Sequence, residues 1–125
     1  MQDCPFCSCQ AEGRIIREER SALAIEDQYP VTKGHHLIIP RRHVATYFDM
    51  TDEERHDADR LLFLLRDDLA AKDPTIDGFN IGMNCGAAAG QTVFHAHIHL
   101  IPRRGGDADN PRGGVRGCVP GKRSY

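Results

Sequence analysis

Between residues 92 and 101 the chain alternates apolar side chains with three histidines, in the order Thr-Val-Phe-His-Ala-His-Ile-His-Leu-Ile. Successive side chains of a β-strand point to opposite faces, so this pattern predicts a strand with one apolar face and one imidazole face. The apolar face, suited to burial under a helix, carries Phe94, Ala96, Ile98 and Leu100, and the other carries His95, His97 and His99. Imidazoles in a row give up packing area and repel one another when charged, so chemistry explains them better than a solvated sheet face does.

Three histidines on one strand can serve two kinds of site. In a catalytic zinc centre they would bind one ion and leave one coordination position open. Three consecutive residues of one face span more length than a single ion reaches comfortably, which strains this alternative. In the second kind, the middle imidazole attacks a phosphorus atom while its neighbours hold and neutralise the phosphate. Gln91 and Thr92 supply nearby polar groups for a phosphate, so the sequence favours the second kind.

The composition is that of one globular domain. The 125 residues are 40% hydrophobic and 27% charged, which excludes a disordered or membrane-embedded protein. The longest apolar stretch, residues 61–65, is far too short to cross a bilayer, and residues 1–5 lack the pattern of a secretory peptide. A net charge of −2 argues against a DNA- or RNA-binding domain. We therefore expect a single cytoplasmic domain over residues 1–125, with no membrane partner.

The hydrophobic pattern predicts several strands and one long helix. Strands are expected at residues 14–16, 22–26, 36–39, 79–84 and 91–102. Thr51 and Glu54 form a capping box that starts a helix, and Asp73-Pro74 ends it. Three- and four-residue steps give this helix one apolar face, made of Ala58, Leu61, Leu62, Leu65 and Leu69. The order of elements predicts an α+β domain with an antiparallel sheet.

The cysteines indicate metal or thiol chemistry, because disulfides are rare in a chain without a signal peptide. Cys4-x-x-Cys7 fits two thiolates of a zinc site, with Pro5 favouring a tight turn between them. A redox dithiol is the alternative, but it needs a preceding strand, which residues 1–3 do not supply. Two further zinc ligands must come from elsewhere in the chain.

Two long segments of the chain resemble a known family. Residues 90–104, Gly-Gln-Thr-Val-Phe-His-Ala-His-Ile-His-Leu-Ile-Pro-Arg-Arg, resemble the histidine triad (HIT) motif of nucleotide hydrolases and transferases. Residues 30–40, Pro-Val-Thr-Lys-Gly-His-His-Leu-Ile-Ile-Pro, resemble the second signature of that family, and the similarity starts at Cys4. The resemblance implies a five-stranded antiparallel sheet, one long helix and a shorter helix near residues 44–48. It also implies a homodimer with a continuous sheet.

The resemblance also implies roles for individual residues. His97 is expected to be the nucleophile, with a backbone carbonyl accepting from its other ring nitrogen, and His99 and His35 are expected beside the phosphate. The groups expected to hold phosphate oxygens or the departing group are Asn84, Gln91 and Thr92. Asp27 matches the residue that binds the ribose hydroxyls, although a turn residue beside Pro30 explains it as well.

For the metal, the resemblance nominates His43 and His95 as the ligands that complete the site of Cys4 and Cys7. A zinc ion closed by four protein ligands is structural rather than catalytic. An N-terminal loop without metal is the alternative. No organic cofactor is expected.

The function that the resemblance implies is hydrolysis at the α-phosphate of an adenine nucleotide through a nucleotidyl-histidine intermediate. Dinucleoside polyphosphates such as diadenosine tetraphosphate are the favoured substrates and adenosine phosphoramidates the second choice. The alternatives are a phosphorylase or nucleotidyl transferase, and a nucleotide-sensing or partner-binding protein without turnover. The arginines and lysines of residues 105–125 either fold over the site or form a solvated extension.

Overall fold

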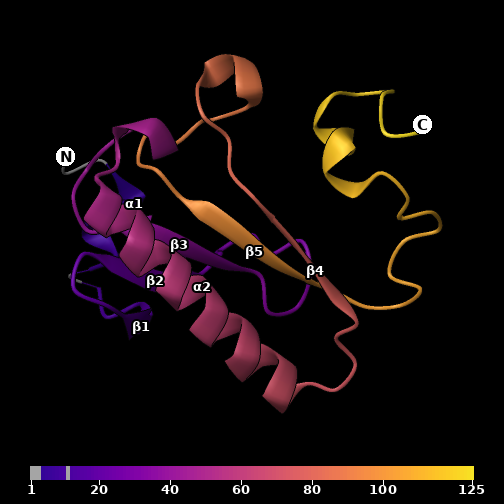
Figure 1. Ribbon diagram of the computed structural model, residues 1–125, viewed down its shortest axis with the longest axis horizontal. Helices are drawn as coiled ribbons and strands as arrows, with labels where there is room; N and C mark the ends of the chain where they lie inside the picture. The colour runs from indigo at the N-terminus through magenta and orange to yellow at the C-terminus, as the bar shows by residue number, and fades with distance from the viewer. Residues whose placement is uncertain (1–3, 11) are drawn as a thin grey trace.

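The computed structural model of the protein describes residues 4–10 and 12–125, with a five-stranded antiparallel sheet at its centre (Figure 1). The strands lie in the order β1-β2-β3-β5-β4, so β1 and β4 are the edges. Their bounds are β1 Ile15–Glu18, β2 Ala22–Glu26, β3 His36–Pro40, β4 Gly78–Gly82 and β5 Ile98–Arg103. The predicted α+β class and the antiparallel sheet are confirmed.

Strand β3 is the central strand of the sheet, and both faces of β3 and of β2 up to Ile25 are buried. They pair along their whole length, from Ala22 opposite Pro40 to Glu26 opposite His36. Strand β5 pairs with the other side of β3, which places His99 opposite Leu37. The histidine-rich segment therefore enters the middle of the sheet rather than an edge.

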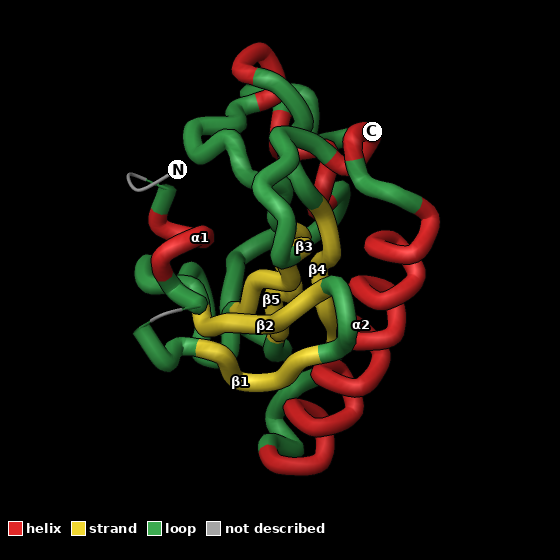
Figure 2. Tube along the Cα trace, turned by 90° about the vertical axis from the view of Figure 1, so that its left-hand side faces the viewer, coloured by secondary structure: helices red, strands yellow, loops and turns green. Residues whose placement is uncertain are grey.

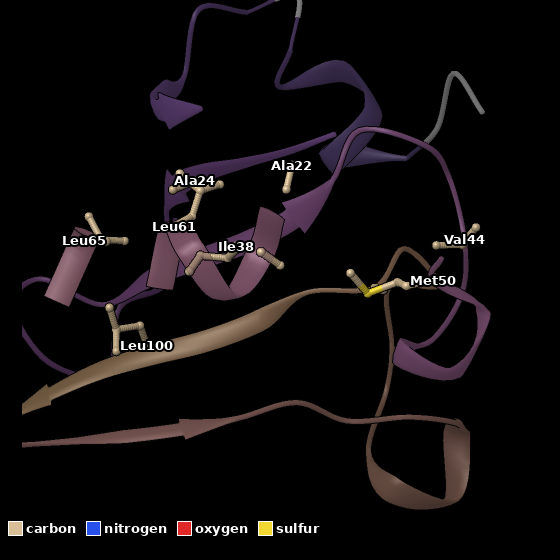
Figure 3. Close-up of a cluster of buried hydrophobic side chains, with 10 residues drawn as sticks. Ala22, Ala24, Ile38, Val44, Met50, Leu61, Leu65 and Leu100 are labelled. Atoms are coloured by element: carbon tan, nitrogen blue, oxygen red, sulfur yellow. The ribbon is translucent and has the colours of Figure 1, made fainter. Parts of the chain in front are cut away.

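Two helices lie on opposite faces of this sheet, as Figure 2 shows. The long helix α2, Asp52–Lys72, covers one face, and the one-turn helix α1, Pro5–Ser8, lies against the other. The core under α2 (Figure 3) includes Ala22, Ala24, Ile38, Val44, Met50, Leu61, Leu65 and Leu100. The core under α1 consists of Phe6, Cys9, Leu23, Ile25, Leu37 and Ile39. Helix α1 takes the place of the tight turn expected around Pro5.

The start of α2 carries both halves of the predicted capping box. Oγ1 of Thr51 accepts from the backbone N–H of Glu54 at 3.1 Å, and the Glu54 carboxylate accepts from the backbone N–H of Thr51 at 2.8 Å. A Thr51→Ala variant is expected to lose about 1 kcal/mol of unfolding free energy, because an N-terminal N–H loses its partner. Urea denaturation measures this, and a loss below about 0.3 kcal/mol would show that the cap is dispensable.

Two sequence predictions need correction. The short helix expected at residues 44–48 is a single 3-10 turn, Tyr47–Asp49, because Thr46 caps it and fixes its start. The strand expected at residues 91–102 is regular only from Ile98 to Arg103. The backbone N–H of Ala96 donates to the Val44 carbonyl at 2.7 Å, and Phe94, expected under the helix, is 47% exposed. No helix among the described residues has the length and apolar character needed to cross a membrane.

Candidate functional site

The loop that leads into β5 is held by the carboxamide of Gln91. Its Oε1 accepts from the backbone N–H of Gly86 at 2.7 Å. Its Nε2 donates to the carbonyls of Ala45 at 2.6 Å and Val93 at 3.1 Å. Gln91 is buried and both ends of its carboxamide are occupied, so this side chain shapes the loop. Its expected contact with a phosphate stays a prediction.

His97 presents one ring nitrogen that is free to act as a nucleophile. Its Nδ1 lies 2.7 Å from the carbonyl oxygen of His95 and donates to it. In the neutral ring the proton then sits on Nδ1, and Nε2 keeps its lone pair. The ring of Phe6 packs edge-on against His97, with 4.9 Å between the ring centroids. The tautomer is thus fixed by a backbone carbonyl and the ring by an aromatic neighbour.

Two hydrogen bonds in series fix the protons of His35 and His99. The backbone N–H of Val31 donates to Nδ1 of His35 at 3.1 Å, so neutral His35 carries its proton on Nε2. That Nε2 lies 2.9 Å from Nδ1 of His99 and donates to it. The proton of neutral His99 is therefore on its own Nε2. His99 also lines a cavity of about 890 Å³, so it can donate to a ligand there.

Asp27 lies beside this pair and also shapes a turn. Its Oδ1 accepts from the backbone N–H of Tyr29 at 2.8 Å, while its Oδ2 is 3.3 Å from Nε2 of His35. Asp27, His35 and His99 are close enough together to be considered as metal ligands. However, Nε2 of His35 is protonated and points its hydrogen at the other groups. The three residues therefore form a hydrogen-bonded cluster, and a metal ion would have to reverse the His35 tautomer.

Burial favours the neutral forms of His35 and His99 by lowering the pKa of each imidazole. It lowers the pKa of His99 to about 4, helped by the neighbouring His97 and His35 and opposed by Asp27. Burial also lowers the pKa of His35, again opposed by the Asp27 carboxylate. Near pH 7 the pair thus offers hydrogen bonds of defined direction rather than positive charge.

These shifts predict a loss of stability in mild acid. The unfolded chain takes up protons on these histidines near their usual pKa of 6.5, whereas folded His99 does so only near 4. The contribution of these histidines to the unfolding free energy is therefore complete above pH 6.5. It is lost as the pH decreases from that value toward the pKa of His99 in the folded protein. Urea unfolding across this pH window measures it, with metal content recorded at each pH. A His99→Gln variant should show a shallower fall, and an unchanged fall would contradict the assignment.

The four predicted metal ligands come together between α1, the segment after β3 and the loop before β5. The Sγ atoms of Cys4 and Cys7 both lie 3.5 Å from Nδ1 of His95. Nδ1 of His43 lies 3.3 Å from Sγ of Cys7. One ligand atom from each of the four residues lies within 4.8 Å of all the others.

The distances and the tautomer in this cluster both fit zinc. Zn–S and Zn–N bonds of about 2.3 and 2.0–2.1 Å at tetrahedral angles separate sulfur and nitrogen ligands by about 3.5 Å. Nε2 of His95 donates to the carbonyl of Pro40 at 2.8 Å, so its Nδ1 faces the two sulfurs with a free lone pair. The neighbouring Cys9 is not one of the four, because it is buried and its thiol donates to the Phe6 carbonyl.

Comparison of the sequence and the fold with known proteins identifies the family of this chain. A family model described as the HIT domain matches residues 8–106. The chain belongs to the histidine triad (HIT) family. A crystal structure of a HIT family protein from Bacillus anthracis superposes with a TM-score of 0.76 at 36% identity, over 83% of this chain and 75% of that one.

Relatives of this HIT protein include two that are named as enzymes. An uncharacterised HIT-like protein of Methanocaldococcus jannaschii is 33% identical over 85% of this chain and 83% of its own length. The adenylylsulfatase HINT3 of Arabidopsis thaliana is 38% identical over 82% of this chain and 53% of its own length. An AP-4-A phosphorylase of Mycobacterium tuberculosis is 34% identical over 78% of this chain and 50% of its own length. This chain therefore spans about half of each enzyme.

Several groups in the site of this HIT protein could not be found from the sequence. The sequence predicted a backbone carbonyl as acceptor for the second ring nitrogen of His97, and in the structure it is that of His95. The N–H of Val31 and the carbonyl of Pro40 set the tautomers of His35 and His95, and these could not be found because backbone groups carry no residue signal. Phe6 packs on His97 only because α1 folds onto the sheet, although its position between Cys4 and Cys7 was a usable hint. His36 is buried, and its Nδ1 donates to the Gly34 carbonyl.

Proposed function

We propose that this HIT protein hydrolyses adenine nucleotides whose α-phosphate carries a substituent, and releases adenosine monophosphate. The observation that supports this best is the pairing of opposite tautomers in neighbouring rings. His97 keeps the lone pair on Nε2, while His99 keeps a proton on Nε2, and their ring centroids are 5.2 Å apart. One ring is prepared to attack phosphorus and the next to donate to a phosphate oxygen.

The reaction then takes two steps. In the first, Nε2 of His97 forms a bond to the α-phosphorus, the bond to the leaving group breaks with its electron pair, and the leaving group takes any proton it needs from solvent. In the second, water attacks the same phosphorus, the P–N bond breaks and the water's extra proton returns to solvent. His99 is hydrogen-bonded to neutral His35, whose other nitrogen accepts from a peptide N–H, so this pair orients a donor and supplies no proton. Asp27 would bind the ribose, and Asn84 and Thr92 would hold the phosphate.

A phosphorylase is the second candidate, because one relative is named an AP-4-A phosphorylase. In that reaction inorganic phosphate, rather than water, attacks the nucleotidyl-histidine. Both functions share the first step and differ only in the acceptor.

The proposal includes one structural zinc ion, held by Cys4, Cys7, His43 and His95. Bound zinc would tie α1 to the central sheet and so keep Phe6 against His97. The ion takes no part in the reaction because four protein ligands leave no open position.

We also propose that the protein is a homodimer with a continuous sheet. Strand β4 is an edge of the sheet and, among the described residues, pairs only with β5. The C-terminal 3-10 helix Gly114–Cys118 contacts β4, so pairing with a partner's strand requires this helix to move aside. Light scattering should give a mass near twice the 13.9 kDa of one chain. A mass near that of a single chain at micromolar concentration would refute the dimer.

A product assay tests the function. The purified protein is incubated with diadenosine tetraphosphate or adenosine 5′-phosphoramidate, each with and without inorganic phosphate. Adenosine monophosphate as the product in both conditions supports hydrolysis. Adenosine diphosphate that appears only with added phosphate identifies a phosphorylase. Binding of both nucleotides without any product would refute an enzymatic role.

A further inference from the structure

The turn before β3, residues 31–34, provides the hydrogen bond that fixes the proton of His35. The turn is closed by the backbone N–H of His35, which donates to the Thr32 carbonyl at 3.2 Å. The backbone N–H of Val31 donates to Nδ1 of His35 at 3.1 Å. This bond leaves the His35 proton on Nε2, which donates to His99. The direction of the hydrogen bond at His99 therefore depends on where the turn lies.

This turn packs closely on the end of β5, the strand that carries His99. Oγ1 of Thr32 donates to the Pro102 carbonyl at 2.7 Å. Gly34 has a φ of +93°, and a Cβ added to it would lie 3.1 Å from Cγ of Pro102. A side chain at this position would strain the backbone and push the turn away from the strand. The contacts with β5 therefore set the position of the turn relative to His99.

Arg104, which directly follows β5, holds the next carbonyl of the turn. Its Nη1 donates to the Lys33 carbonyl at 2.9 Å. Its Nη2 donates to Oδ2 of Asp73 at 2.8 Å, and its Nε donates to Oγ1 of Thr75 at 3.3 Å. Asp73 is itself held, because its Oδ1 accepts from the backbone N–H and the hydroxyl of Thr75 at 2.9 and 2.5 Å. One guanidinium group thus joins the end of β5, the end of α2 and the turn before β3.

The surroundings of Arg104 are those of a fixed structural contact. Each of its three guanidinium nitrogens has an acceptor, and its side chain is only 20% exposed. Hydrogen bonds from Thr75 and Arg104 hold the pKa of the Asp73 carboxyl well below its usual range, so the ion pair persists at neutral pH. Arg104 is not among the described residues that line the cavity at His99. Any effect of Arg104 on a reaction in that cavity must therefore pass through the turn.

We propose that Arg104 is a positioning residue, which holds the turn before β3 so that His35 keeps His99 oriented as a hydrogen-bond donor toward the α-phosphate. This inference rests on the proposed function and adds to it a residue that does not touch the substrate. The guanidinium group suits the role because its planar fork fixes acceptors from different elements at defined angles. A donor displaced by about 1 Å can slow a reaction by up to about 100-fold, so such a contact affects the rate.

The test observes the His99 ring directly, without substrate. Protein with 15N-labelled histidine is examined by NMR at neutral pH, and the His99 resonances are identified by their absence in His99→Gln. In wild type, Nδ1 of His99 should have the shift of an acceptor nitrogen and Nε2 that of a protonated one. In Arg104→Met the two tautomers should mix, so the two shifts should move toward each other. On adenosine 5′-phosphoramidate, kcat of this variant should fall about 10-fold while KM stays within about twofold.

Thr32→Val and Thr32→Ser are a matched pair that tests the other contact of the turn with β5. Valine has the shape of threonine but cannot donate to the Pro102 carbonyl, so it should shift the His99 resonances in the same direction. Serine keeps the hydroxyl and should leave them as in wild type. Thr32 lines the cavity at His99, so this pair is compared by the spectra alone. It provides the decisive result if Arg104→Met does not fold.

Arg17→Met is the control for Arg104→Met, because Arg17 also joins a strand to α2, through an ion pair with Asp68 at 2.5 Å. That pair lies between the edge strand β1 and α2 and includes neither the turn nor β5. The control should keep the His99 resonances and kcat of wild type. Unchanged His99 resonances in the folded test variants, or an equal fall of kcat in the control, would overturn the positioning role. Shifted resonances in a protein whose wild type turns over no nucleotide would instead overturn the proposed function alone.

Discussion

A His97→Asn variant is expected to lose turnover by at least about 10³-fold, because the amide that replaces the imidazole cannot form the covalent bond to phosphorus. Asparagine can still donate from its side-chain amide to the His95 carbonyl, which His97 contacts at 2.7 Å. The substitution therefore removes the nucleophile with little disturbance of the loop. Single-turnover assays with an adenosine phosphoramidate measure the loss.

Two checks make this result specific to the nucleophile. His56→Asn, on the exposed face of α2, should retain full activity. The metal content and the thermal unfolding midpoint of the His97 variant should equal those of wild type. Residual turnover within about tenfold of wild type would remove His97 from the mechanism.

The His43→Ala variant is expected to lose its zinc and about 3 kcal/mol or more of unfolding free energy. In the wild-type protein Nδ1 of His43 lies 3.3 Å from Sγ of Cys7, so removal of the His43 ring takes one of the four proposed ligands away. Wild-type protein should contain one zinc per chain by elemental analysis, and a chelator should lower its stability to that of the variant.

Cys118→Ser is the control for this experiment, because Cys118 is an exposed cysteine away from the four ligands. It should keep the zinc and the stability of wild type. Wild-type protein that binds no zinc after purification in zinc-containing buffer would refute the metal site. A zinc-free His43→Ala variant of unchanged stability would instead show that the ion does not support the fold.

The proposed metal site and the proposed nucleophile, His97, are connected through one residue. The imidazole of His95 faces the two cysteine sulfurs, while its carbonyl accepts from Nδ1 of His97. We therefore expect the zinc-free protein to be slower as well as less stable, with a smaller loss of kcat than in His97→Asn.

Much of the fold could be predicted because local pattern and tertiary packing agree there. The strand expected at residues 22–26 is β2 without change, and α2 starts at its capping box and ends before Asp73-Pro74. Helix α1 could not be predicted because four residues are too few to show a helical period. The start of β5 could not be predicted. The side-chain hydrogen bonds of Gln91 and the Ala96–Val44 contact hold residues 91–96 outside the regular strand, which begins only at Ile98.

The sequence predicted which kinds of chemistry the histidines could perform, but it did not predict their arrangement in space. The alternating pattern placed three imidazoles on one face, but in the structure His95 is fully buried and turns to the cysteines, while His97 and His99 are half-buried. Alternation holds within a regular strand, and the strand begins only at Ile98. The separation of His95, which lies beside the cysteines, from His97 and His99 therefore depends on contacts distant in the sequence.

The docking of α1 against the loop before β5 has a consequence for how the protein becomes active. Cys4 and His95 are 91 positions apart, and Phe6 reaches His97 across a similar span. Contacts between such distant positions close slowly, because a long loop must be ordered before they form. During synthesis the first residues must wait until nearly the whole domain has left the ribosome. We therefore expect catalytic competence to appear as a late kinetic phase, after the sheet and α2 have already acquired their secondary structure.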